Sequence, residues 1–114
     1  MNDELKKLHE ILIAQHQALY DKLDTVTDPA VARTIVTEMQ ELLHRVDVLQ
    51  GLLFRETTTR LKRSMSKIGK ADTALDKDLQ NAKSAADYVK SVSKFLVFVD
   101  QAIDLAKTLA PMAI

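Results

Sequence analysis

Apolar side chains recur along residues 3–26 at the spacing of one helix face. They are separated by three, four and seven positions, and they are Leu5, Leu8, Leu12, Leu19, Leu23 and Val26. Asp28 and Pro29 follow this segment. The pair is typical of a helix start, because the carboxylate accepts from free backbone N–H groups and proline is tolerated in the first turn. The pattern predicts a helix over residues 3–26 and a second helix that begins at Pro29.

A heptad repeat of apolar residues follows. Its positions step by four, three, four, three and four residues, and we call them the heptad seam: Ile35, Met39, Leu42, Val46, Leu49 and Leu53. Such a repeat is typical of helices that pack side by side at a shallow angle, as in a coiled coil. The β-branched residues Thr57–Thr59 lower helix propensity, so a break there stays open. The pattern nevertheless favours one continuous helix over residues 29–69, with a turn after Gly69.

The last predicted helix covers residues 73–110 and ends before Pro111. In its second half the apolar positions, which include Phe95 and Phe98, span about half of the circumference at 100° per residue. An arc of this width contacts at least two neighbouring helices. In its first half the seam consists mostly of small residues: Leu75, Leu79, Ala82, Ala86 and Val89.

The three helices predict a single all-α domain over residues 1–114, folded as an elongated antiparallel three-helix bundle with coiled-coil-like packing. One end of the bundle, residues 55–87, would be a helical hairpin with a thin core of threonine, serine and alanine. Two helices alone bury little apolar surface. We therefore expect this end to recruit a partner, either a second copy in a symmetric dimer or another helical protein.

Composition narrows the choice of fold and location. The 114 residues include only two glycines and two prolines, which excludes folds rich in tight turns, such as β-sandwiches and β-barrels. The absence of cysteine excludes disulfides, thiolate nucleophiles and cysteine-ligated zinc sites. We find neither a signal peptide nor an apolar run long enough to cross a bilayer, and we expect a cytoplasmic location.

Charge is balanced overall, with 16 basic and 16 acidic residues, but residues 55–70 hold six basic residues against one acidic residue. On a continuous helix four of the six fall within about 100° of one another. We call these four the basic stripe: Arg55, Lys62, Arg63 and Lys70. Clustered lysine and arginine suit phosphate binding, but the segment has no aromatic residue for base stacking, so nucleic-acid binding would be non-specific. A solvated or protein-facing surface is the favoured interpretation.

Candidate catalytic and metal-binding residues are few. Glu41 and His44 fit the Glu-x-x-His spacing of di-metal bundles, but the motif occurs once and His44 faces away from the heptad seam. His9 and His16 lie about 10 Å apart along one helix, too far to bind one metal ion. No serine has the glycine-flanked setting of a nucleophile, and no glycine-rich phosphate loop is present. We expect no metal, no cofactor and no enzymatic activity.

The sequence thus favours a non-enzymatic helical module for protein–protein interaction or self-assembly. The expected contact residues are the heptad seam together with Phe95 and Phe98. Two alternatives stay open. One is a nucleic-acid-associated protein that uses the basic stripe, and the other docks the apolar face around Phe95 and Phe98 on a membrane interface.

Overall fold

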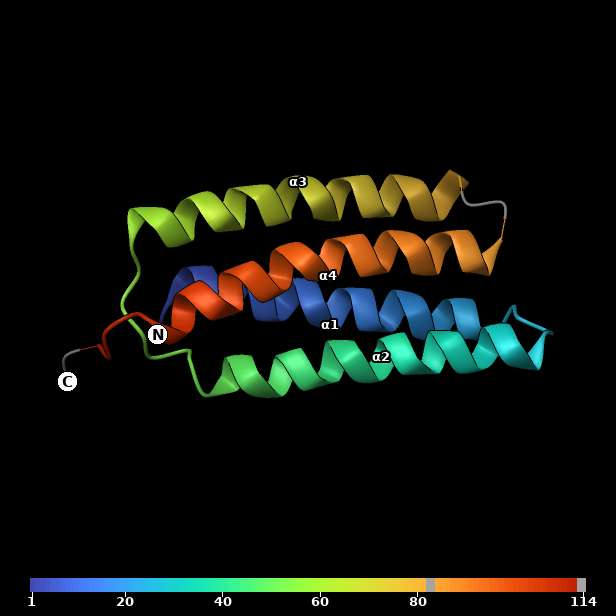
Figure 1. Cartoon of the computed structure of the whole chain (residues 1–114), viewed down its shortest axis with the longest axis horizontal. Helices are drawn as coiled ribbons and strands as arrows, with labels where there is room; N and C mark the ends of the chain where they lie inside the picture. The colour runs from blue at the N-terminus through green and yellow to red at the C-terminus, as the bar shows by residue number, and fades with distance from the viewer. Residues whose placement is uncertain (82–83, 113–114) are drawn as a thin grey trace.

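The computed structural model describes residues 1–81 and 84–112, and in this part of the chain it contains four α-helices and no strand. The helices are α1 (Asp3–Leu23), α2 (Pro29–Gln50), α3 (Thr59–Asn81) and α4 (Ala85–Lys107), shown in Figure 1. The all-α fold class is confirmed. The bundle has four helices where the sequence predicted three, because the chain is interrupted twice where it was expected to stay helical.

Each helix begins after a side chain that accepts hydrogen bonds from the otherwise free N–H groups of the first turn. At α1, Asn2 Oδ1 accepts from the backbone N–H groups of Glu4 and Leu5, at 3.0 and 3.1 Å. The other three helices have one such bond each, of 2.9 to 3.2 Å, and their capping residues are Asp28, Thr58 and Ser84. A cap of this kind stabilises a helix by about 1 kcal/mol.

The first interruption separates α2 from α3 at residues 51–58, so the predicted continuous helix over residues 29–69 is wrong. On a continued α2, Leu52 would lie about 90° from the centre of the buried face. Leaving the helix lets Leu52 turn into the core, where it is buried. Two residues of the threonine run lie in this loop, and Thr58 caps the helix that follows.

The second interruption lies between α3 and α4, so the predicted turn after Gly69 and the predicted helix over residues 73–110 are both wrong. Gly69 lies inside α3. A glycine there costs about 1 kcal/mol relative to alanine. Burial of the apolar side chains of Ile68 and Leu75 on the same helix outweighs this cost. The predicted seam position Ala82 lies outside the described residues.

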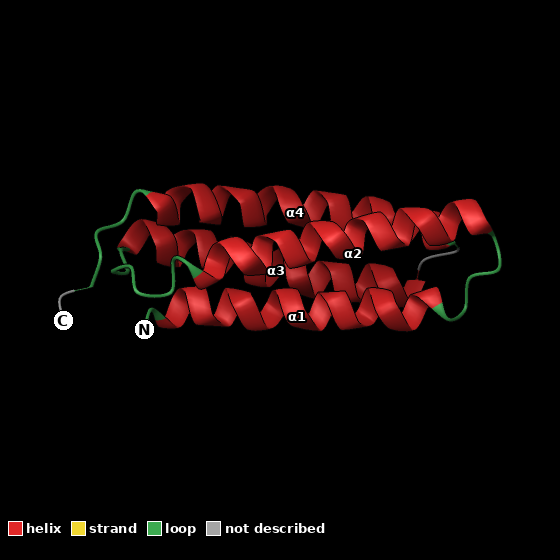
Figure 2. Cartoon of the chain, turned by 90° about the horizontal axis from the view of Figure 1, so that it is seen from below, coloured by secondary structure: helices red, strands yellow, loops and turns green. Residues whose placement is uncertain are grey.

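Consecutive helices run antiparallel, and the chain forms two hairpins, α1–α2 and α3–α4 (Figure 1). The hairpins pack against each other so that α1 lies beside α3 and α2 lies beside α4, each pair running parallel. α2 and α3 are consecutive in the chain but occupy opposite corners of the bundle (Figures 1 and 2). The bundle measures 50 × 22 × 17 Å. In the described residues, the thin two-helix end predicted over residues 55–87 is not found, because α3 and α4 pack on the first hairpin.

The loop over residues 51–58 meets both ends of the chain at one tip of the bundle (Figure 1). Asn2 Nδ2 donates to the carbonyl oxygen of Arg55 at 2.9 Å, and the N–H of Met112 donates to that of Phe54 at 2.7 Å. The guanidinium of Arg55 donates to the carbonyl oxygen of Leu109 at 2.8 Å. These bonds hold the connection between the two hairpins in place.

Candidate interaction surfaces

The heptad seam packs inside the chain. Four of its residues are buried and two are half-buried against the same core; in sequence order they are Ile35, Met39, Leu42, Val46, Leu49 and Leu53. Phe95 is also buried. Of the eight expected contact residues, Phe98 alone has an exposed side chain, with 36% of its surface accessible. The repeat that indicated a partner helix is thus occupied by helices of the same chain.

Phe98 lines a shallow groove between α3 and α4. The groove has a volume of about 190 Å³, and two small residues of α3, Ala71 and Ala74, form part of its floor. Lys94 and Asp78 lie at the same groove. The groove is too small for most ligands, which occupy pockets of roughly 300–1,000 Å³.

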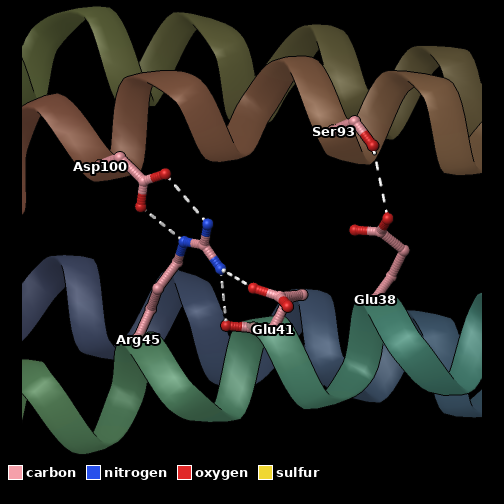
Figure 3. A network of polar contacts seen from close by, with 5 residues as sticks. All are labelled: Glu38, Glu41, Arg45, Ser93 and Asp100. Atoms are coloured by element: carbon pink, nitrogen blue, oxygen red, sulfur yellow. Dashed lines mark hydrogen bonds and ion pairs between the residues drawn. The ribbon is translucent and has the colours of Figure 1, made fainter.

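A polar network joins α2 to α4 on the adjacent side of the bundle (Figure 3). The guanidinium of Arg45 donates to both carboxylate oxygens of Asp100, at 2.7 and 3.0 Å, and to a carboxylate oxygen of Glu41 at 2.9 Å. The hydrogen bonds to Asp100 raise the pKa of Arg45 above its ordinary value. A second contact is made by Ser93, which donates to Glu38 at 3.4 Å. Burial raises the pKa of Glu38, and the bond from Ser93 partly opposes that shift.

A second polar network lies within the bundle and connects three helices. Gln15 of α1 is buried, and its Nε2 donates to Asp72 at 2.7 Å and to Asp76 at 3.2 Å, both on α3. Its Oε1 accepts from the hydroxyl of Tyr88 on α4, at 3.3 Å. Burial raises the pKa of Tyr88 to about 12, and the carboxylates of Asp76 and Asp72 add to the shift. Burial also raises the pKa of Asp72.

Four large apolar side chains are exposed on α1 and α2, and we call them the apolar strip: Ile13 (44% accessible), Tyr20 (52%), Val36 (40%) and Leu43 (42%). On α1, Gln15 faces α3. At 100° per residue, Ile13 and Tyr20 lie on the other side of the buried face, toward α2. The apolar strip therefore has its α1 half next to α2.

The same argument places the α2 half of the strip next to α1. Arg45 faces α4, and Val36 and Leu43 lie about 160–180° away from it around the helix. Because α1 and α2 are antiparallel neighbours, the two halves of the apolar strip lie side by side along the hairpin. Half-buried residues fill the positions between them: His9, His16 and Met39.

Charged residues lie beyond the ends of the apolar strip. Helix geometry places Lys6 and Asp47 past one end of the strip and Asp24 past the other. All three are exposed. The α1–α2 face is therefore uncharged and mostly apolar at its centre and charged at its rim, which is the usual anatomy of a protein–protein interface.

The N-terminal half of α3 carries the strongest concentration of positive charge. Five basic side chains are exposed there, and we call them the basic face: Arg60, Lys62, Arg63, Lys67 and Lys70. The basic stripe expected from the sequence is only partly assembled, because Arg55 lies in the loop, where it binds Leu109. Arg60 and Lys67 take its place. They line a groove of about 290 Å³ between α3 and α4, together with Arg63, Ser64, Gln101 and Leu105.

The two residues of the Glu-x-x-His motif do not form a site together. Glu41 pairs with Arg45, and His44 is exposed. Within residues 1–81 and 84–112 we find no group of three or more histidine, aspartate and glutamate side chains that could hold a metal ion. In the same residues no helix has the length and apolar character needed to cross a membrane.

No protein-family model, no curated protein and no solved structure matches the chain. A function for this protein is therefore inferred from the surfaces described above.

Proposed function

We propose that this protein is a non-enzymatic self-assembly module, a symmetric homodimer that forms through the α1–α2 face. The observation that supports the proposal is the apolar strip, in which Ile13, Tyr20, Val36 and Leu43 are exposed on adjacent helices. Soluble monomers seldom gather large apolar side chains on one face without a partner. The heptad seam contributes the half-buried Met39 to this face, whereas its four fully buried residues pack within the chain.

A second copy is the partner that the charge pattern favours. In a two-fold dimer the same patch meets itself, so a strongly charged patch would repel its own copy. The centre of the α1–α2 face carries apolar and histidine side chains together with the uncharged amides of Gln17 and Gln40, and its charged residues lie at the rim. Such a face meets itself without placing like charges opposite each other at its centre.

The size of the face indicates a dimer of moderate affinity. α1 has 21 residues and is about 32 Å long, and two helices side by side are about 20 Å wide. Complete contact would bury about 650 Å² per copy, or about 1,300 Å² in total. This lies at the lower end of the range for stable, specific interfaces. We therefore expect dissociation at low micromolar concentration or below.

The test is light scattering after size exclusion over a concentration series. The wild-type mass should rise from that of one chain toward that of two. Leu43→Lys and Ile13→Lys should each keep the protein at the mass of one chain, because each places a charge at the centre of the contact. Val97→Lys is the matched control, since Val97 is an exposed apolar residue of α4, 55% accessible.

Two results would contradict the proposal. One is a wild-type mass that stays at that of one chain up to about 500 µM, far above the Kd expected of such an interface. The other is a loss of dimer in Val97→Lys equal to the loss in Leu43→Lys.

A further inference from the structure

We infer that the basic face of α3 is a docking surface for the phosphate backbone of double-stranded nucleic acid, bound without sequence specificity. The inference rests on Arg60, Lys62, Arg63, Lys67 and Lys70 and on the groove beside them, and it does not depend on self-assembly. The apolar strip lies on the α1–α2 hairpin and the basic face on the α3–α4 hairpin, so the two surfaces do not overlap.

Four of the five charges of the basic face lie in a row without an acidic neighbour in sequence, whereas Lys62 lines a separate groove with Asp3 and Glu4. From Arg60 to Lys70 there is no acidic residue. In the described residues both side-chain ion pairs belong to Arg45, so none involves the basic face. The helix α4 shows the contrasting arrangement, because its three lysines are matched there by three aspartates, Asp87, Asp100 and Asp104. Mixed charge is what an ordinary solvated helix face carries.

The position of these charges works against the helix that carries them. The N-terminus of a helix is the positive end of its dipole, and cationic side chains in the first turns are unfavourable there. Arg60 and Lys62 lie within the first turn of α3. This first turn has no acidic residue. Arg60, Arg63 and Lys67 also repel one another, because they are three and four residues apart. An external anion would relieve both costs.

The spacing of the basic face suits a repeating anion. Arg60, Arg63, Lys67 and Lys70 follow one another at three, four and three residues, which keeps them within about 80° around the helix. Successive side chains are about 4.5–6 Å apart along the axis, and the row spans about 15 Å. Ser64 and Gln101 add uncharged hydrogen-bond donors to the adjoining groove. Donors in such a row contact several consecutive phosphates of one strand.

The surroundings favour a nucleic-acid duplex over a membrane or a single strand. Helices that bind a membrane interface insert large apolar side chains next to their basic residues. None of the exposed residues of α3 is a large hydrophobic one. Proteins that bind single strands stack bases on aromatic side chains, and α3 has none. The remaining mode of binding is contact with the phosphate backbone of a nucleic-acid duplex. Such contact carries no sequence information.

Fluorescence anisotropy with a labelled duplex of about 25 base pairs tests the inference. If four or five phosphates are neutralised, the affinity of the wild-type protein should fall about 100- to 500-fold between about 50 and about 200 mM salt. The fourfold variant R60Q/R63Q/K67Q/K70Q should lose binding. The control K7Q/R33Q/K90Q/K107Q removes the same charge from exposed positions elsewhere and should keep it.

A melting curve separates a binding role from a structural one. Because the basic residues oppose the dipole of α3, the fourfold variant should melt at the same temperature as wild type or about 2–5 °C above it. Should the fourfold variant fail to fold, the pairs R60Q/R63Q and K67Q/K70Q take its place, each lowering duplex affinity about 10- to 100-fold.

Three results would overturn the inference. The fourfold variant could bind the duplex as tightly as wild type, or the control could lose binding to the same extent. The wild-type protein could also bind vesicles of phosphatidylserine and phosphatidylcholine while leaving the duplex free.

Discussion

Gln15 carries an amide into the bundle at a position where the neighbouring turns of α1 carry leucine. An amide offers both donors and an acceptor, so one side chain bonds to the carboxylates of Asp72 and Asp76 and to the hydroxyl of Tyr88. An apolar residue would leave these groups without that partner. The network also specifies packing, because it is satisfied only when Gln15 of α1 faces both α3 and α4 at this level.

Replacing Gln15 by leucine should therefore destabilise the fold. We expect the free energy of unfolding to fall by about 1–3 kcal/mol, because polar groups of Asp72 and Tyr88 lose a buried partner. Urea denaturation measures the change. Gln17→Leu is the control, since Gln17 is exposed and bonds only to Asp21, and it should change stability by less than about 0.5 kcal/mol. Equal stability of the two variants would refute a structural role for the network.

Tyr88 should make stability fall at high pH. Its pKa is raised from 10.0 to about 12 in the folded protein, so the folded state holds the phenol proton after the unfolded state has lost it. The contribution of Tyr88 is complete below pH 10 and is lost as the pH rises toward 12.

Comparing Y20F with Y20F/Y88F isolates this effect, because the chain has two tyrosines. Urea midpoints at several pH values, with the phenolate absorbance recorded in parallel, measure it. Y20F should lose more stability than Y20F/Y88F between pH 10 and 12. Parallel curves for the two proteins would show that the ionisation of Tyr88 is not linked to folding.

At the scale of the elements, the Arg45–Asp100 pair holds two parallel helices that no short loop connects. The bidentate bond joins α2 to α4, and the side chain of Arg45 is only 14% accessible. Bidentate geometry and partial burial make the pair stronger than an ordinary surface ion pair.

A double-mutant cycle with Arg45→Ala and Asp100→Ala should give a coupling energy of about 1 kcal/mol. Because half of the Asp100 side chain is accessible, the coupling should weaken in about 1 M salt. Thermal unfolding of the four proteins of the cycle measures it. A coupling of zero at low salt would mean that apolar packing alone sets the α2–α4 contact.

The start of a helix could be predicted from the sequence where a local capping signal marks it. Asp28 and Pro29 act through their own backbone neighbours, and Asp28 caps α2 in the structure. The loop over residues 51–58 has a different origin. Leu52 leaves the helix to reach the core, and Arg55 binds a carbonyl 54 residues away. Neither contact has a counterpart in local propensity. The local signals of the break were Gly51, which directly follows α2, and the threonine run.

The candidate surfaces were predictable to different degrees. The heptad seam identified buried positions, but periodicity does not tell whether the partner helix belongs to the same chain. The basic face followed from charge density, although including Arg55 depended on a continuous helix that the structure does not have. Ile13 and Tyr20 could have been found by their spacing of seven. Pairing them with Val36 and Leu43 required knowing which helices are neighbours.

For the whole molecule, the two-hairpin arrangement places the apolar strip and the basic face on different hairpins. The first hairpin carries a net charge of −4 over residues 1–54, from five basic and nine acidic residues, and it presents the apolar strip. The second hairpin presents the basic face. A dimer formed through the first hairpins would turn its two basic faces outward, away from each other.

Met1 and Met112 line one groove at a tip of the bundle, together with Arg55 and Thr57 of the loop over residues 51–58. A fluorescent tag or a surface anchor attached at either residue would project beyond that tip, along the long axis. The α1–α2 face would stay unobstructed, whereas Lys62, which lines one groove with Met1 and Met112, would lie beside the attachment. A tether at this tip therefore suits experiments on the apolar strip better than experiments on the basic face.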